Sequence, residues 1–145
     1  RNLVENGEVE KVSEMMIYPY SVSGEVKEGK QLGRRLSFPT LNISEPEKII
    51  PQNGTYITAT VIESKVYRSV TNIGYNPTTD LLSQHKKIET NVIGENLGNI
   101  YGKRITIYFF KKLRNEIKFS NFSELSAQVF NDINSALSSS LLTSW

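Results

Sequence analysis

Residues Gly54–Glu63 read GTYITATVIE, a run dense in β-branched side chains. Branched side chains pack well on a pleated sheet but lose rotamer freedom in a helix, so this run favours an extended strand. The turn signal Gln52-Asn53-Gly54 stands at its start, and Ser64-Lys65 follows its end. We therefore predict a strand here, joined by a short turn to the next β-branched run, Val66–Ile73.

Further strands are predicted on both sides of this pair. Tyr20–Val26 alternates between apolar and polar residues, and Lys103–Lys111 (KRITIYFFK) is rich in β-branched and aromatic side chains. The remaining candidates are Lys87–Ile93 and a brief segment around Glu116–Phe119, with turn signals at Asn76-Pro77 and Leu113–Asn115. Short strands at this spacing predict a mainly β protein, built as a small antiparallel barrel rather than from alternating βαβ units.

A helical pattern precedes the strands. Arg1–Met16 places apolar residues at roughly helical spacing, interrupted at Asn6-Gly7. This predicts two short connector helices, of which Glu8–Met16 is the better formed. Pro19 ends the region, because proline disfavours helical geometry in the residue before it. We expect connector helices over residues 1–19.

A second helical pattern closes the chain. Ser123–Ser138 is predicted to be a helix with Ser123 as its N-cap. Its apolar stripe consists of Leu125, Val129, Ile133, Ala136 and Leu137. Residues 20–145 are therefore expected to form one domain, a barrel with a C-terminal helix.

The composition is that of an ordinary globular domain. With 145 residues, of which 38% are hydrophobic, the chain is long enough to bury its own core. A net charge of +2 gives no excess of cations for nucleic acid or a membrane surface. No apolar run approaches the roughly 18–20 residues of a membrane span. The absence of cysteine excludes disulfides and thiolate sites and fits a reducing compartment, so we expect a cytoplasmic protein. Because the chain starts at Arg1 rather than Met, we expect it to be a piece of a longer polypeptide.

The stretch Gly24–Asn42 (GEVKEGKQLGRRLSFPTLN) holds three glycines and four cations, followed by Phe-Pro-Thr-Leu-Asn. Glycines let backbone N–H groups approach a ligand closely, and cations with a hydroxyl suit phosphate and metal. We therefore consider a phosphate-and-metal loop, with a glycine-rich surface hairpin as the alternative. A nucleotide P-loop is not expected, because Gln31 replaces the hydroxyl that binds magnesium and Pro39 stands where a helix should continue.

Thr40 and Asn42 are candidate metal ligands within this stretch. Magnesium prefers hard oxygen donors and keeps several waters, so a hydroxyl and an amide oxygen beside phosphate oxygens would suffice. The preceding Pro39 fixes the backbone and helps to set the direction of Thr40. The alternative is that both side chains satisfy backbone groups of a turn.

Glu89 is a candidate general base on a predicted strand. A carboxylate can accept the proton of a hydroxyl within hydrogen-bond reach. The alternative is an exposed strand glutamate that pairs with Lys86 or Lys87. The single histidine, His85, lies in a polar loop and is given no role.

Four ordered motifs carry a resemblance to a known family. The first, G-x-V-x-x-G-x-x-x-G-R-x-L-G-F-P-T-A-N, is matched by ten residues between Gly24 and Asn42, and the second, N-I-G-x-x-P-T, by Asn72–Thr78. The third, E-T-H with an apolar pair and a later Y-G, appears as Glu89-Thr90-Asn91-Val92-Ile93 and Tyr101-Gly102, and the fourth, R-x-E-x-x-F, as Arg114–Phe119. The closing helix also matches, through Leu125, Gln128 and Asp132. The chain resembles the riboflavin kinase family, in particular the C-terminal kinase module of bacterial bifunctional riboflavin kinase/FAD synthetases.

The resemblance implies a fold and an activity. The fold is a six-stranded antiparallel closed barrel with a C-terminal helix, which agrees with the strand pattern. The activity is the ATP-dependent phosphorylation of riboflavin at its ribityl 5′-hydroxyl, giving FMN and ADP, with Mg²⁺ as the metal. Asn6-Gly7 through Tyr20 resembles the connector that follows an adenylyltransferase domain, so we expect an N-terminal FMN adenylyltransferase domain in the native chain. Riboflavin and ATP are the expected partners, with no nucleic acid and no membrane.

It also implies roles for single residues. Thr40 and Asn42 would hold Mg²⁺ with the nucleotide phosphates, and Glu89 would take the proton from the ribityl hydroxyl. Arg114 corresponds to the family's flavin-side loop and would help to close the site over the substrate. The phosphate-binding residues would be Gly24, Gly29, Gly33 and Arg34.

The chain departs from the family motifs at several positions. Ser37 replaces a glycine, Leu41 replaces an alanine, and Asn91 replaces the histidine of E-T-H. We expect the change at Asn91 to alter any hydrogen bond that orients the base. These departures keep open a second hypothesis, a flavin- or nucleotide-binding module that has lost catalysis. A third, an oligonucleotide-binding barrel, is disfavoured by the mild net charge and the lack of aromatic–basic interleaving.

Overall fold

A computed structural model of the chain describes residues 2–11, 19–27, 40–44, 46, 48–75, 86–93, 97, 100–117 and 121–138. Within these ranges two helices and six strands are assigned. The helices are α1 (Asn2–Glu5) and α4 (Phe122–Ser138). The strands are β1 (Tyr20–Lys27), β2 (Thr40–Ile43), β3 (Gly54–Ile62), β4 (Lys65–Tyr75), β5 (Lys86–Val92) and β6 (Arg104–Arg114).

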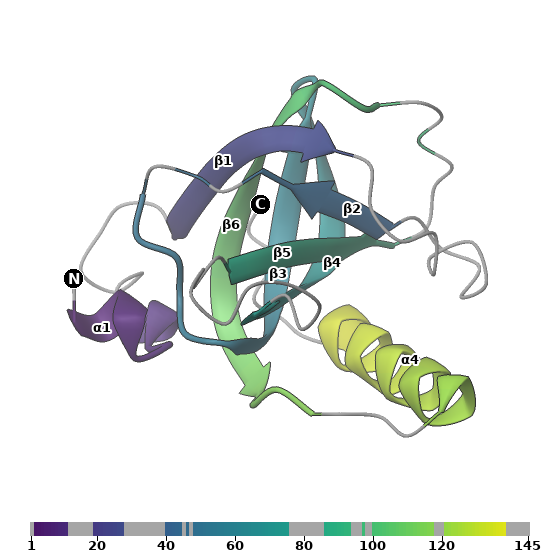
Figure 1. Cartoon of the computed structure of the whole chain (residues 1–145). Helices are drawn as coiled ribbons and strands as arrows, with labels where there is room; N and C mark the ends of the chain where they lie inside the picture. The colour runs from purple at the N-terminus through teal and green to yellow at the C-terminus, as the bar shows by residue number, and fades with distance from the viewer. Residues whose placement is uncertain are drawn as a thin grey trace.

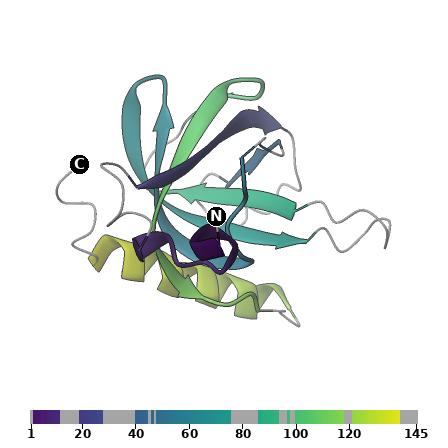
Figure 2. The same ribbon diagram turned by 90° about the vertical axis from the view of Figure 1, so that its left-hand side faces the viewer.

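The six strands close into an antiparallel barrel in the order β1-β2-β5-β4-β3-β6 (Figure 1). Strand β1 closes the ring, because it pairs with β2 on one side and with β6 on the other. The two helices lie outside the ring, toward its lower end in both views (Figures 1 and 2). The predicted fold class, a mainly β closed barrel of six antiparallel strands with a C-terminal helix, is confirmed.

Five of the six strands were located by sequence, but the sixth was placed wrongly. Residues 115–117 are not in a strand, and β6 instead continues two residues into the predicted turn at Leu113–Asn115. Because the barrel is closed and β6 already pairs with β1 and β3, no strand edge is left for Glu116 and Ile117 to pair with, and the rest of that predicted strand lies outside the described residues. The missing strand is β2, which has only four residues and therefore little periodicity of its own.

The inner face of the barrel is the larger hydrophobic core. Tyr56 and Phe109 are fully buried there and meet edge to face with ring centroids 5.3 Å apart. The buried members of this cluster are Val9, Val22, Val26, Leu41, Ile43, Tyr56, Ile62, Ile73, Ile88, Val92, Ile100, Ile105, Ile107 and Phe109. All but two of them come from the strands, so the apolar halves of the alternating strand patterns point inward.

A chain of hydroxyl groups also lies inside the barrel. Thr58 Oγ1 lies 2.7 Å from Ser69 Oγ and 2.8 Å from Thr71 Oγ1. The chain extends from Ser69 to Thr60 at 2.8 Å and from Thr71 to Thr90 at 2.9 Å. All five residues are fully buried, so their hydrogen bonds replace water and tie β3, β4 and β5 together in one register.

Helix α4, the predicted C-terminal helix, packs on the outer face of β3 and β4. The second hydrophobic cluster joins the two surfaces and consists of Ile57, Ala59, Val70, Phe110, Val129, Ile133 and Ala136. Asn121 caps the helix, since its Oδ1 accepts a hydrogen bond of 2.9 Å from the Glu124 N–H, so the prediction of Ser123 as N-cap was wrong. Leu137, predicted as a member of the apolar stripe, is 46% exposed and does not share the burial of Val129, Ile133 and Ala136. The side chain of Leu125 is not among those described.

The N-terminal segment contributes to the barrel core. Its predicted interruption is present, because α1 ends at Glu5 and Gly7 has a φ of 79°, which favours glycine. Residues 9–11 resume helical geometry, whereas the rest of the predicted helix Glu8–Met16 lies outside the described residues. Val9 is fully buried in the inner cluster. Among the helices described, none combines the length and apolarity needed to span a membrane.

Candidate functional site

Five polar residues, one from each of five neighbouring strands, lie directly beside one another across the barrel wall. The register pairs Asn42 with Glu89, Glu89 with Asn72, Asn72 with Thr55, and Thr55 with Arg114. Directly opposed residues of antiparallel strands carry their side chains on the same face. For the first four residues, a sequence neighbour belongs to the inner core (Leu41, Ile88, Ile73 and Tyr56), so their side chains lie on the outer face, and Arg114 joins them as the partner of Thr55.

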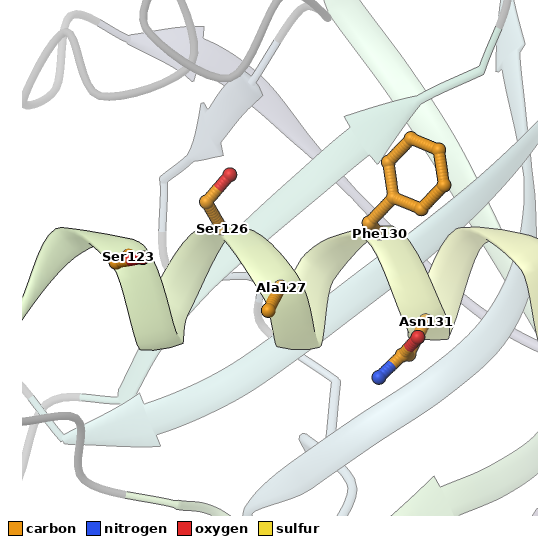
Figure 3. A pocket seen from close by; sticks show the side chains of 5 residues that line it. All are labelled: Ser123, Ser126, Ala127, Phe130 and Asn131. Atoms are coloured by element: carbon orange, nitrogen blue, oxygen red, sulfur yellow. The ribbon is translucent and has the colours of Figure 1, made fainter.

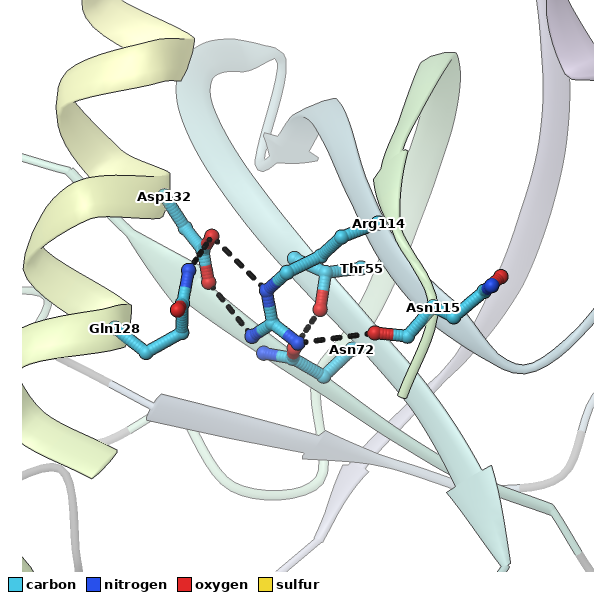
Figure 4. Close-up of polar contacts among 6 residues, drawn as sticks. All are labelled: Thr55, Asn72, Arg114, Asn115, Gln128 and Asp132. Carbon is cyan, nitrogen blue, oxygen red and sulfur yellow. Dashed lines mark hydrogen bonds and ion pairs between the residues drawn. The ribbon is translucent and has the colours of Figure 1, made fainter. Parts of the chain in front are cut away.

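The polar row ends at α4. The Arg114 guanidinium donates two hydrogen bonds to the Asp132 carboxylate, from Nε at 3.1 Å and from Nη2 at 2.8 Å (Figure 4). Gln128 Nε2 donates to the same carboxylate at 3.0 Å. The Asp132 side chain is only 5% exposed, so this two-point ion pair is strongly held. It fixes Arg114 at the junction of barrel and helix.

Asn72 occupies the middle of the polar row. Thr55 Oγ1 donates a hydrogen bond of 2.6 Å to Asn72 Oδ1 (Figure 4). The amide nitrogen of Asn72 points away from Thr55 in the same view. Because Glu89 is the neighbour on the other side, the row presents an amide donor next to a carboxylate. No role is predicted for Asn72 or Thr55 from the sequence, although Asn72 opens the second family motif, because only the strand register sets Asn72 beside Glu89 and Thr55 beside Asn72.

Glu89 is flanked by polar side chains on both sides. Its Cα partners are Asn42 on β2 and Asn72 on β4. Its carboxylate forms an ion pair with Lys87, two residues away on the same face of β5, and both side chains are 31% exposed. The ion pair that the structural alternative required is therefore present. Glu89 also has what a general base needs, a carboxylate open to solvent within a polar row.

Thr40 and Asn42 project from the same face of β2, since they are two residues apart in a strand. Neither lies in a turn, so the alternative that they satisfy turn backbone groups is wrong. Thr40 Oγ1 donates a hydrogen bond of 2.7 Å to Asn91 Oδ1. Asn42 is 5% exposed, and its Oδ1 accepts no hydrogen bond from the residues that the structure describes. A buried acceptor without a donor is costly unless a ligand supplies one or a cation lies against it.

Gly24 is buried in β1 against the neighbouring strand. A Cβ built on it would lie 2.4 Å from Ile43 Cγ2 and 2.8 Å from the Ser44 carbonyl oxygen. Close packing of β1 on β2 therefore accounts for a glycine here. The other predicted phosphate-binding residues, Gly29, Gly33 and Arg34, lie outside the described residues, so phosphate binding by this set stays a prediction.

An open hollow lies beside α4, lined by Ser123, Ser126, Ala127, Phe130 and Asn131 (Figure 3). Phe130 is 63% exposed, the most exposed large apolar residue described. The lining includes no member of the polar row and neither Gln128 nor Asp132. The hollow is therefore separate from the polar row.

In the part of the chain that is described, no group of three or more His, Cys, Asp or Glu side chains could hold a metal ion. A cation at the polar row would therefore need the hydroxyl and amide oxygens of Thr40 and Asn42, completed by oxygens of a ligand. Magnesium accepts such a mixed oxygen shell and retains waters in it.

Comparison with known proteins places these features in a family. The family model described as "Flavokinase: Riboflavin kinase" matches residues 16–140. The bifunctional riboflavin kinase/FMN adenylyltransferase of Bacillus subtilis (strain 168) is 34% identical over 139 residues, which cover 94% of this chain and 44% of that protein. The corresponding protein of Escherichia coli (strain K12) is 33% identical over 116 residues, or 79% of this chain and 36% of its own. The chain thus spans less than half the length of these relatives.

The fold recurs in a solved structure. A crystal structure titled as a macrolide-efflux protein from Streptococcus pneumoniae superposes with a TM-score of 0.87 and 23% sequence identity, covering 96% of this chain and 45% of that chain. At this identity the likeness concerns the fold alone.

Proposed function

Because the chain belongs to the riboflavin kinase family, we propose that it transfers the γ-phosphoryl group of ATP to the ribityl 5′-hydroxyl of riboflavin, giving FMN and ADP. The observation that carries this proposal is the polar row. It sets a solvent-accessible carboxylate, Glu89, between two amide side chains on one face of the barrel. Phosphoryl transfer needs mainly positioning and charge neutralisation, and a row of fixed polar groups supplies the positioning.

The oxygens of β2 fit a divalent cation. Asn42 Oδ1 is buried without a donor, and Thr40 offers a hydroxyl oxygen on the same face. We propose that Thr40 and Asn42 hold Mg²⁺ together with phosphate oxygens of the nucleotide. The ion would supply neutralisation of the charge on the transferred phosphoryl group.

Glu89 is proposed to act as the general base. Its carboxylate accepts the proton of the 5′-hydroxyl while the hydroxyl oxygen bonds to the γ-phosphorus, and the bond from that phosphorus to the bridging oxygen of ADP breaks. Lys87 balances the charge of Glu89 before the substrate arrives. The amide of Asn72, held by Thr55, is placed to keep the carboxylate or the hydroxyl in line.

The remaining roles follow from position in the chain. We propose that Gly24, Gly29, Gly33 and Arg34 bind the nucleotide phosphates. Arg114 would lie on the flavin side, since the ion pair with Asp132 fixes it at the opposite end of the polar row from Asn42. An adjoining FMN adenylyltransferase domain is part of the same proposal, supported by the names of the curated relatives. A native location in the cytoplasm is proposed with it.

The deciding experiment is a chromatographic flavin assay. The protein is incubated with riboflavin, ATP and Mg²⁺, and FMN is quantified against a control without protein. FMN formation that depends on both ATP and Mg²⁺ supports the kinase. If no FMN forms above the control, the proposed kinase function is wrong. Tight FMN binding without turnover would instead support the flavin-binding module considered from the sequence.

A further inference from the structure

We propose that Asn91 is a positioning residue that fixes the direction of the Thr40 hydroxyl, so that the Thr40 oxygen can only accept and is reserved for a divalent cation. This inference rests on the proposed kinase function, which it deepens at the metal-binding end of the polar row. Neither the family motif nor the relatives assign this asparagine a role, and the motif has a histidine in its place.

The geometry ties the two residues together. Thr40 and Asn91 are direct Cα partners across β2 and β5. The Thr40 Oγ1–Asn91 Oδ1 hydrogen bond of 2.7 Å is at the usual distance for a hydroxyl donor. Asn91 is 4% exposed and is also the register partner of Val70 on β4. An amide confined between two neighbouring strands has little freedom to turn away.

The chemistry of a hydroxyl then determines what Thr40 can bind. A threonine hydroxyl has one proton to donate and two lone pairs to accept with. Once the proton is committed to Asn91, the oxygen has only lone pairs to offer. Such an oxygen attracts a cation or a hydrogen-bond donor, but it has no proton to donate to a phosphate oxygen. The contact therefore assigns Thr40 to the metal rather than to direct phosphate binding.

Asn42 supplies an independent second observation. Its buried Oδ1 also offers only lone pairs and has no donor among the described residues. Thr40 and Asn42 thus present two acceptor oxygens on the same face of β2. Their register partners, Asn91 and Glu89, are likewise two residues apart on β5. One strand would supply the two ligands, and the other would supply the orienting amide and the base.

The first test is the Mg²⁺ dependence of FMN formation. In Asn91→Leu the hydroxyl loses its acceptor and can turn its proton toward the ion, so the Mg²⁺ concentration for half-maximal rate is expected to rise at least ten-fold. The KM for riboflavin is expected to stay within two-fold. Asn91→Asp keeps an acceptor oxygen and is expected to restore Mg²⁺ activation. Should Asn91→Leu not fold, Asn91→Ala removes the same acceptor.

Ser69→Ala is the matched control. It removes a buried hydroxyl partner from the inner face of β4 and leaves the polar row intact. It is expected to lower stability without changing the Mg²⁺ requirement. An equal loss of Mg²⁺ activation in Ser69→Ala would assign the effect of Asn91 to general destabilisation and overturn the inference.

The second test reads metal binding without turnover. Binding of Mn²⁺ in the presence of ADP, followed by electron paramagnetic resonance, is expected to weaken about ten-fold in Asn91→Leu. If Asn91 acts through Thr40, the double variant Thr40→Val/Asn91→Leu binds no more weakly than Thr40→Val alone. Additive losses would overturn the inference. If the wild type is active and Asn91→Leu has unchanged Mg²⁺ activation, the inference is also overturned. If the wild type makes no FMN but its Mn²⁺–ADP binding is weakened by Asn91→Leu, only the proposed kinase function is overturned.

Discussion

Glu89 and Asn42 are direct cross-strand partners, so the carboxylate of β5 and the buried amide of β2 lie side by side on the outer face of the barrel. They are separated by 47 positions in the sequence and come together only through the pairing of these strands. This pairing sets the proposed base next to the proposed metal ligand.

Glu89→Gln is expected to lower kcat for FMN formation by about 10²- to 10⁴-fold, because the amide cannot accept the hydroxyl proton. Binding of the nucleotide, measured by calorimetry with ADP and Mg²⁺, is expected to remain nearly intact. Glu63→Gln is the matched control, since Glu63 is exposed and paired with Lys103 away from the polar row. Turnover of Glu89→Gln at the wild-type level would mean that Glu89 is not the base.

Asp132→Ala is expected to destabilise the protein by about 3 kcal/mol, because it leaves the largely buried Arg114 guanidinium without its carboxylate. Urea denaturation measures this loss. The KM for riboflavin is expected to rise as well, since Arg114 is no longer held at the end of the polar row. A matched removal of an exposed pair, Lys11→Ala, is expected to cost less than about 1 kcal/mol. Similar losses in the two variants would contradict the importance of the barrel–helix contact.

Thr71→Val is expected to destabilise the barrel by about 1–3 kcal/mol, because it leaves the buried Thr90 hydroxyl without its partner and takes one of two partners from the Thr58 hydroxyl. Chemical denaturation of the variant beside the wild type gives the value. Because Thr90 follows Glu89 in β5, a small fall in kcat is expected too. A variant as stable as the wild type would show that the hydroxyl chain does not hold the register.

Gly24→Ala and Gly74→Ala are expected to differ in stability. At Gly24 the new methyl meets the Ile43 side chain and a backbone oxygen, so β2 must move, at a cost of about 1–3 kcal/mol. At Gly74 it meets the Glu116 carboxylate, which belongs to a flexible exposed side chain that can rotate away. Thermal denaturation of both variants tests the contrast, and equal losses would speak against it.

Tyr56 gives the protein a stability that falls in alkali. Burial raises the pKa of its phenol well above 10, and the hydroxyl donates a hydrogen bond to the Gln52 carbonyl. In the unfolded chain the phenol ionises near pH 10, whereas in the folded protein it stays protonated there. Ionisation therefore stabilises the unfolded state, and the free energy of unfolding falls as the pH rises past that value. Urea denaturation at pH 8 and pH 10.5 is expected to show a steeper loss for the wild type than for Tyr56→Phe. Equal losses in both proteins would mean that Tyr56 does not carry this dependence.

The sequence was informative where each residue could be judged by itself or with its neighbours. The β-branched side chains of Gly54–Glu63 and Lys103–Lys111 predict strands. The candidate site residues Thr40, Asn42 and Glu89 could be named from residue type and motif. The sequence does not show which residues face each other on neighbouring strands. Asn72 opens the second family motif and Thr55 belongs to no motif, but only the strand pairing sets Asn72 beside Glu89 and Thr55 beside Asn72.

The errors have the same origin. Strand β2 is held by β1 and β5 rather than by its own four residues, so local propensity gave no signal for it. Glu116 and Ile117 stand in a segment with a strand pattern, but neither lies in a strand of the closed barrel. Leu137 fits the helical period and still lies past the end of the surface that α4 covers.

Val9 is a core residue of the barrel that lies outside its strands. Its side chain lies among those of the inner core, although it precedes the first strand by eleven positions. The cooperative folding unit therefore begins upstream of the barrel itself. A fragment that started at Tyr20 would keep every strand, but the core residues that Val9 covers would be exposed to water. A separate peptide that contains Val9 is expected to bind this fragment and cover them again.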